Sequence, residues 1–187
     1  MSGRELLRTM DADFTHAAAL WGRPLHVRLV RSVGTFLLYP RIRAVVVYRL
    51  SAAAWERRWL RPLALWLQTR AIRSSGAEIH PAARIGPGLQ LAHSVGIVIG
   101  HEVVAGRDLM LMQGVTLGHR GGPGQPVLGD RVRLMAGCSV LGPVRIGDDA
   151  VVGAGAVVLD DVPAGHVAVG VPASSQPRRS APAGDRP

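Results

Sequence analysis

The sequence predicts a mainly β fold, in which short parallel strands wind into a triangular solenoid behind a helical N-terminal segment. Aliphatic residues return at every sixth position over half of the 187-residue chain, and glycine often follows the periodic residue directly. Another small or aliphatic residue stands two positions before it. This period fits neither a helix of about 3.6 residues per turn nor hairpins with turns about every 8–12 residues. It fits a solenoid in which each hexad contributes one strand and one corner.

The periodic residues form three runs, and we expect their side chains to point into the solenoid. The runs are Ile79, Ile85, Leu91, Ile97, then Ile99, Ala105, Leu111, Leu117, and then Leu128, Leu134, Val140, Ile146, Val152, Val158. Cys138, the single cysteine, stands two positions before one of them. It cannot form an internal disulfide, so we expect a buried thiol that packs as a small hydrophobic group.

Residues 1–75 are expected to form the helical N-terminal segment. Residues 1–20 are weakly patterned, and prolines interrupt the stretch that follows. From 41 to about 73, apolar residues recur at spacings near three and four with arginines between them, which is a helical pattern. Because proline is tolerated only in the first turn of a helix, Pro62 should divide this stretch into two helices.

The solenoid domain is expected over residues 76–173, with its coils between 77 and about 162 and a final strand and exit from 163 to 173. Residues 174–187 are rich in Pro, Ser and Arg. That composition predicts a disordered tail, because such a segment buries too little apolar surface to fold.

Charge and hydropathy narrow the class of protein. The net charge is +9, and residues 1–75 account for it with 13 Arg against 4 acidic residues. These arginines are spread through an apolar stretch, so a solvated helical face is favoured over a nucleic-acid site or an anionic-membrane contact. No signal peptide and no run of about 18 apolar residues is visible. A cytoplasmic protein is therefore expected.

Two interruptions of the repeat direct attention to function, because inserted loops on a repeat scaffold usually carry its site. The first falls at 91–96, where the phase slips by two residues before Ile99. The second runs from 118 to 127, where 11 residues separate Leu117 from Leu128 in place of six. Four glycines and two prolines predict that this second segment projects as a loop.

In order along the chain, these motifs resemble the hexapeptide-repeat O-acetyltransferases, and most closely the serine acetyltransferases. The resemblance covers about 41–173. The matching segments are Tyr48-Arg49, Glu78-Ile79-His80-Pro81-Ala82-Ala83, His93 with Gly96-Ile97-Val98-Ile99-Gly100, Gln113-Gly114-Val115-Thr116-Leu117-Gly118, Leu141-Gly142-Pro143, Gly147-Asp148 and Gly170-Val171-Pro172-Ala173.

The resemblance implies a left-handed parallel β-helix that assembles as a homotrimer, with acetyl-CoA as co-substrate in a groove between neighbouring subunits. General crossover rules favour the right hand, so the left hand rests on the family alone. The resemblance also implies that His93 is the general base and that Glu78 orients it. An imidazole suits this role because it accepts a proton near neutral pH.

Other site residues follow from the same resemblance. His119 and Arg120 in the glycine-rich loop are candidates for binding a small-molecule acceptor, although a solvated loop histidine explains His119 equally well. The positions that match coenzyme A contacts are Gly118, Ala136, Gly137 and Ala154. Small residues at corners of the solenoid have an equally good steric explanation.

His80 is expected to be structural, and His101 and His166 have no assigned partner. No residues show metal-ligand spacing, and the glycine loop lacks the Lys-Ser/Thr of a P-loop.

The chain departs from the serine acetyltransferase pattern at the acceptor end. Ala92 stands where the family has Asp before the catalytic histidine, and Gly124-Gln125 replace an Arg-His pair before Pro126. Arg120 could take over the lost clamp on a carboxylate. The chain also ends at Pro187, without the family's C-terminal isoleucine that inserts into the next enzyme of cysteine synthesis.

L-Serine is therefore the nominal acceptor, with a sugar, an exopolysaccharide unit or another small alcohol as the alternative. Two different classes of function remain open: a non-catalytic solenoid scaffold, and a protein tethered to a membrane surface by its Arg- and Trp-containing helices.

Overall fold

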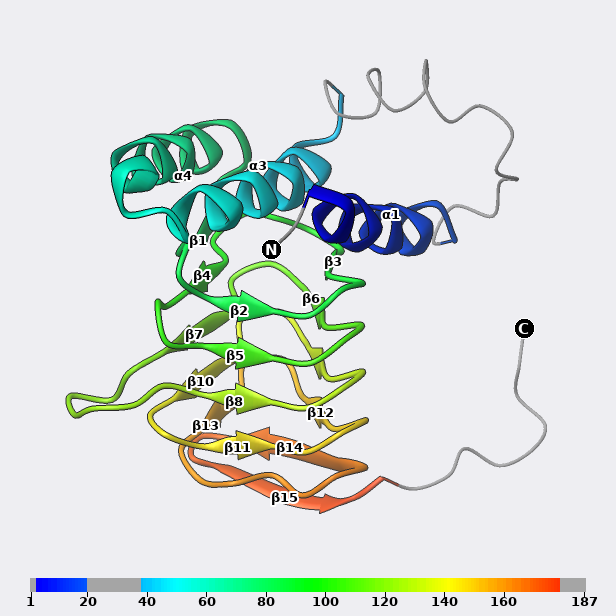
Figure 1. Ribbon diagram of the computed structural model, residues 1–187. Helices are drawn as coiled ribbons and strands as arrows, with labels where there is room; N and C mark the ends of the chain where they lie inside the picture. Colours follow the sequence, from blue (N-terminus) through cyan, green and yellow to red (C-terminus); the bar gives the residue numbers. More distant parts are fainter. Residues whose placement is uncertain (1–2, 20–37, 179–187) are drawn as a thin grey trace.

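A computed structural model describes residues 3–19 and 38–178, which form a β-helix capped at one end by three helices (Figure 1). The helices are α1 (Gly3–Ala19), α3 (Pro40–Trp55) and α4 (Arg61–Ser75), with a 3₁₀ turn η1 (Arg58–Leu60) between the last two. Pro62 lies in the first turn of α4, as predicted, and Gly76 ends that helix in the left-handed conformation. None of the helices in the described residues is long and apolar enough to span a bilayer.

Fifteen short strands follow, and they sort into three sheets that form the faces of a triangular prism and are parallel except at the last strand (Figure 1). Sheet A contains β1 (Glu78–Ile79), β4 (Val98–Ile99), β7 (Thr116–Gly118), β10 (Ser139–Leu141) and β13 (Val157–Val158). Sheet B contains β2 (Arg84–Ile85), β5 (Val104–Ala105), β8 (Val127–Leu128) and β11 (Arg145–Ile146). Sheet C contains β3 (Gln90–Leu91), β6 (Met110–Leu111), β9 (Arg133–Leu134), β12 (Val151–Val152), β14 (His166–Gly170) and β15 (Ala173–Pro177).

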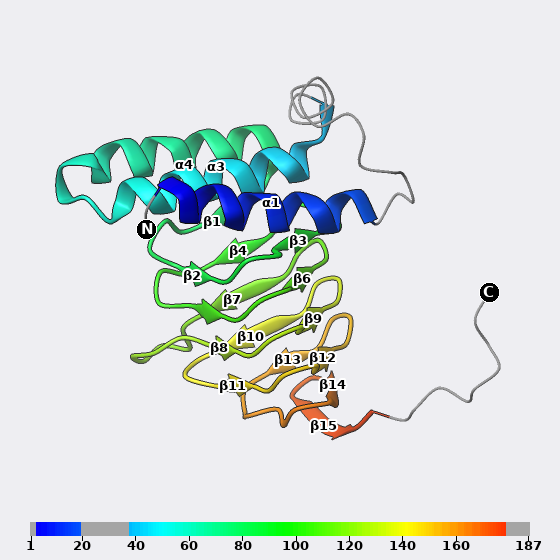
Figure 2. The same ribbon diagram turned by 45° about the vertical axis from the view of Figure 1, so that its right-hand side comes forward.

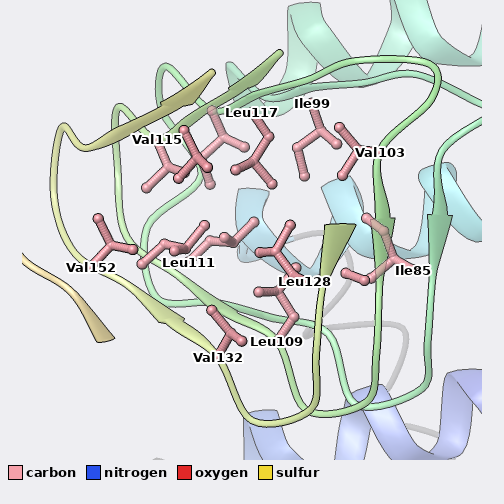
Figure 3. Packing of buried hydrophobic residues seen from close by; sticks show 14 of the residues in the cluster. Ile85, Ile99, Val103, Leu109, Leu111, Val115, Leu117, Leu128, Val132 and Val152 are labelled. Carbon is pink, nitrogen blue, oxygen red and sulfur yellow. The ribbon is translucent and has the colours of Figure 1, made fainter. Parts of the chain in front are cut away.

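The predicted hexads are the inward-facing residues of these strands. Leu111, Leu117, Leu134, Val140 and Val152 have no exposed surface, and Figure 3 shows several of their neighbours converging on the axis of the prism. Leu117 stacks between Ile99 and Val140 of the adjoining coils. Coils of the same shape can stack only if their inward side chains have similar volumes, and the Val, Leu, Ile and Ala residues of this chain meet that requirement.

The two interruptions appear as insertions in the coil register. Glu78 pairs with Val98, twenty residues away, whereas Val98 pairs with Thr116 after eighteen. The two extra residues lie in the turn 92–97, and Ile97 accordingly takes the place two residues before the inward Ile99. Thr116 then pairs with Ser139 after twenty-three residues, because the loop 119–126 adds five. In Figure 1 that loop projects from the body between β7 and β8.

The coils wind with the left hand that the family resemblance implied. In Figure 1 the strands of sheet B cross the front of the molecule from left to right while successive coils descend.

Three edges join the sheets, and we name them by the sheets that they connect. The C–A edge comprises turns 92–97, 112–115, 135–138 and 153–156, and the A–B edge comprises 80–83, 100–103, 119–126 and 142–144. The B–C edge comprises 86–89, 106–109, 129–132 and 147–150.

The C-terminal segment differs from the predicted disordered tail over its first residues. Ala173–Pro177 forms β15, which pairs antiparallel with β14 at the end of sheet C (Figure 2). The low apolar content of this segment misled the prediction, because an edge strand needs backbone partners more than buried side chains. The remainder of the expected tail, 179–187, lies outside the described residues, as does 20–37 of the helical segment.

The helical cap seals the first coil through polar side chains. The Tyr48 hydroxyl donates to the Ala83 carbonyl at 2.8 Å, and the Arg49 guanidinium donates to the carbonyls of Ile85 and Gly86. The carboxylate of Asp13 on α1 pairs with Arg49 at 2.8 Å and accepts the backbone N–H groups of Gly88 and Leu89. These contacts satisfy backbone groups that no earlier coil can pair.

Candidate active site

His93 lies at the head of the C–A edge, in the turn that carries the two-residue insertion. Its side chain is exposed, while the residues around it are fixed by the helical cap. Arg41 of α3 donates to the Ala92 carbonyl at 3.2 Å, and the buried Ser94 hydroxyl donates to the Ser75 carbonyl at 2.7 Å. The Gly96 N–H donates to the Gly76 carbonyl at 2.9 Å. The backbone is thus held on both sides of an imidazole that remains open to solvent.

Glu78 lies on the coil next to this turn, because its N–H donates to the Ile97 carbonyl at 2.8 Å. Its side chain is exposed on the outer face of sheet A. Within the described residues, no hydrogen bond or ion pair joins Glu78 to His93. The structure places the two predicted partners on neighbouring turns of the chain, and a direct contact between them stays a prediction.

Below His93, the C–A edge is lined by glycines that share one backbone conformation. Gly96, Gly114, Gly137 and Gly155 all have φ between 66° and 73°. Each donates its N–H to a carbonyl of the coil above, from Gly76 down to Ala136, at 2.8–3.0 Å. A Cβ added at Gly137 or Gly155 would meet nothing within 4 Å. The edge is therefore open at its lower two glycines, and the sequence spacing of these glycines could have indicated it.

The predicted coenzyme A residues divide between two edges. Ala136, Gly137 and Ala154 lie on the C–A edge, beneath His93. Gly118 ends β7, at the opposite margin of sheet A, where an added Cβ would also meet nothing within 4 Å. Three of the four positions therefore share an edge with the candidate base.

The predicted acceptor residues lie on the A–B edge and not beside His93. His119 and Arg120 begin the loop 119–126, and both are exposed. The loop lies over the next coil, since an added Cβ at Gly142 would contact the Arg120 Cβ at 3.4 Å. Within one chain, the whole width of sheet A separates these residues from the candidate base.

At the base of this loop is a polar cluster that sequence analysis did not identify. Gln125 is buried, its Nε2 lies 3.2 Å from His101 Nδ1, and its Oε1 accepts the Glu102 N–H at 3.3 Å. The His101 ring packs edge-on against His80, with centroids 5.7 Å apart, and His80 packs in the same way against Trp55 at 5.2 Å. Nothing in the local sequence around Gln125 signals burial, because the coil register brings its partners from 23 and 24 residues upstream.

His80 has the structural role that the sequence suggested. Its Nδ1 accepts the Ala82 N–H at 3.0 Å within the turn 80–83. Burial and the neighbouring His101 lower the pKa of His80, while the Glu78 carboxylate acts in the opposite direction. A neutral imidazole is consistent with an acceptor nitrogen. Within residues 3–19 and 38–178, no group of three His, Cys, Asp or Glu side chains could hold a metal ion.

Comparison with known proteins assigns the family. The family model of bacterial transferase hexapeptides, six repeats, matches residues 125–160. The serine acetyltransferase of Helicobacter pylori strain J99 is 46% identical over 142 residues, which cover 74% of this chain and 82% of the relative.

Solved structures agree with this assignment. Soybean serine acetyltransferase complexed with serine superposes with a TM-score of 0.80 at 37% identity, covering 92% of this chain and 70% of the soybean chain. A serine acetyltransferase in complex with CoA superposes with a TM-score of 0.79 at 32% identity, covering 93% of this chain and 71% of the other. Together with the His93 turn on a capped left-handed β-helix, these similarities show that the chain belongs to the serine acetyltransferase family of hexapeptide-repeat acyltransferases.

Proposed function

We propose that this protein transfers an acetyl group from acetyl-CoA to the hydroxyl of L-serine, with His93 as the general base. One observation carries the proposal: an exposed imidazole stands on a clamped turn at the head of an open glycine-lined edge. A rigid backbone with a free side chain is what general base catalysis requires, because the imidazole must reach the substrate proton in a defined position.

In the proposed reaction, His93 takes the proton of the serine hydroxyl while the oxygen attacks the thioester carbonyl carbon. The carbon–sulfur bond then breaks, and the CoA thiolate takes the proton from the imidazolium. Glu78, on the neighbouring coil, stabilises the imidazolium through its negative charge. Backbone N–H groups near the glycine loop hold the oxyanion of the tetrahedral intermediate.

The groove for acetyl-CoA is assigned to the C–A edge, along Ala136, Gly137 and Ala154. The absence of side chains at the glycines leaves backbone groups accessible to the pantetheine arm of the thioester. Gly118 at the other margin of sheet A belongs to the same groove only if a second chain lies against it.

A homotrimer supplies that second chain. One protomer presents its C–A edge with His93, and the neighbour presents its A–B edge with His119 and Arg120, so that base and acceptor residues meet between copies. Sedimentation velocity should show a trimer, and dilution to monomers should abolish turnover. A monomer that acetylates serine would contradict this assembly.

Release of the CoA thiol from acetyl-CoA in the presence of serine tests the activity. The change His93→Ala should lower kcat by about 10²–10⁴-fold, which is the usual contribution of a general base, without changing the assembly. His166→Ala is a matched control, because His166 lies on β14, away from both edges of the site. Equal activity of His93→Ala and the control would remove His93 from the mechanism.

A sugar or another small alcohol is the rival acceptor. The observation that favours it is the acceptor end itself, where Ala92 and the buried Gln125 offer no charge to a zwitterion and loop 119–126 contains no acidic residue. Comparing kcat/KM for serine with values for sugars and simple alcohols separates the two. Turnover of a sugar but not of serine would replace serine as the substrate and leave the acetyl transfer intact.

A further inference from the structure

We propose that Gln125 is a positioning residue that locks the loop 119–126 in place and thereby sets how tightly the protein holds its alcohol substrate. The proposal rests on the proposed function, because the same loop carries His119 and Arg120, the candidate acceptor contacts. The proposed role of Gln125 is to act through the loop whose base it holds.

Gln125 and its neighbour Pro126 are the buried residues of the loop 119–126. Residues 119–123 are exposed, whereas Gln125 retains only 5% of its surface. Its amide fills the space beside Gly100, where an added Cβ would overlap the amide oxygen. A glycine at position 100 therefore makes room for this side chain, and a buried amide in such a place must be hydrogen-bonded to be tolerated.

The two hydrogen bonds of the lock have a defined polarity. The backbone N–H of Glu102 can only donate, so the amide oxygen of Gln125 faces it at 3.3 Å. The amide nitrogen must then donate to His101 Nδ1 at 3.2 Å. This arrangement requires an unprotonated Nδ1 on His101.

His101 is itself supported from the helical cap. The rings of His101, His80 and Trp55 form a continuous edge-on column from the A–B edge to α3, and the Arg61 guanidinium lies 4.8 Å from the Trp55 ring centroid. Gln125 thus connects the loop to a side chain that is 58% exposed but packs against the rings leading to α3.

Other contacts at the loop are weaker constraints. Beyond Gln125, the Pro126 carbonyl accepts the Val104 N–H at 3.2 Å, which fixes the start of the next strand. On the other side, Arg120 and Gly124 lie close to Gly142 and Pro143, and the Gly118 carbonyl before the loop accepts the Gly142 N–H at 2.9 Å. Loss of the amide should therefore release the segment that carries His119 and Arg120 while leaving the coil intact.

Hydrogen–deuterium exchange and steady-state kinetics on the full chain test the lock. In Gln125→Ala, residues 119–126 should exchange faster, and KM for the acceptor should rise about tenfold with a far smaller change in kcat, as expected for two hydrogen bonds lost from binding geometry. His101→Ala should have the same effect, and the double variant should be no worse than either single one. Gln176→Ala, at an exposed glutamine of β15, is the control.

Unchanged exchange in the loop together with an unchanged KM would overturn the proposal. The exchange measurement needs no turnover, so it tests whether Gln125 holds the loop even if the acceptor is not serine. Faster exchange in a protein that acetylates no alcohol would instead count against the proposed function. If Gln125→Ala does not fold, the Gln125→Met variant below, which keeps the volume of the side chain, answers the question.

A second variant separates the hydrogen bonds of the lock from the volume of its side chain. In Gln125→Met the side chain still fills the space beside Gly100, but it has no amide to bond the Glu102 N–H or His101 Nδ1. Residues 119–126 should again exchange faster, and KM for the acceptor should rise with little change in kcat. A Gln125→Met protein with the exchange and KM of the unaltered protein would refute the lock.

Discussion

Cys138 illustrates how position in the coil decides the chemistry of a single residue. It lies at the C–A edge with no exposed surface, two residues before the inward Val140. Burial raises the pKa of its thiol to about 12, because the thiolate would lose its hydration among aliphatic neighbours. The sequence predicted this burial from the hexad phase alone.

We expect the Cys138 thiol to resist alkylation by iodoacetamide at pH 8 in the folded protein. The thiolate is the reactive species, and neither it nor the reagent is accommodated in the core. Mass spectrometry should show no adduct until denaturant is added, when the thiol should react fully. Modification at the same rate with and without denaturant would mean that this coil is not packed as described.

At this scale, the sequence predicted where His93 stands but not what surrounds Gln125. The phase slip at 91–96 is a local signal, and it marked the turn that carries His93. The partners of Gln125 come from the previous coil, at a register that depends on the length of the inserted loop. Glu78 is an intermediate case, because the coil length places it beside the turn 92–97 but does not set the direction of its side chain.

The glycine column of the C–A edge is the element whose role can be tested most cleanly. Gly137 and Gly165 have φ of 68° and 69°, and an added Cβ would meet nothing within 4 Å at either site. Replacing either glycine by alanine should therefore lower the free energy of unfolding by about 1 kcal/mol, because alanine is strained at this φ. Gly137 lies on the proposed groove, whereas Gly165 lies in the turn before β14, away from it.

We expect Gly137→Ala to raise KM for acetyl-CoA severalfold, while Gly165→Ala leaves it unchanged. The new methyl group would occupy space that the pantetheine arm needs, and the matched strain at Gly165 controls for any general loss of stability. Urea unfolding of both variants should give similar free energies. Equal KM values for the two would place the thioester elsewhere.

Elements with a strong internal period were predicted well, and those held by tertiary contacts were not. Helices α3 and α4 and the solenoid strands follow the apolar pattern of the sequence. Strand β15 lacks such a pattern, because it depends on backbone pairing with β14. Residues 1–20, which include helix α1, are only weakly patterned, and no local pattern distinguishes Asp13, whose carboxylate binds Arg49 and the first coil.

On the scale of the whole molecule, the pair of Asp13 and Arg49 joins α1, α3 and the first coil. Both side chains are almost fully buried, at 3% and 5% exposure. Arg49 lies within the Tyr48-Arg49 motif noted in the sequence, but its partner lies 36 residues upstream. Each group is hydrogen-bonded to backbone as well, which is the condition under which a buried ion pair is tolerated.

Replacing Asp13 by Ala should lower the free energy of unfolding by about 3–5 kcal/mol, because it leaves a buried guanidinium without a counter-charge. The double variant Asp13→Ala/Arg49→Met should lose less than Asp13→Ala alone, since no unpaired charge remains. Asp160→Ala, at an exposed carboxylate, is the control for urea unfolding. A double variant less stable than Asp13→Ala would show that the charge itself is not the cause.

The sealed first coil also affects how the ends of the β-helix meet other chains. A ladder of parallel rungs has no inherent end, and its terminal backbone groups could template another chain in the manner of a growing fibril. The side chains of Tyr48, Arg49 and Asp13 occupy those groups at one end, and at the other the reversal of β15 stops the parallel register of sheet C. The same contacts that attach the helices therefore also guard against end-to-end polymerisation.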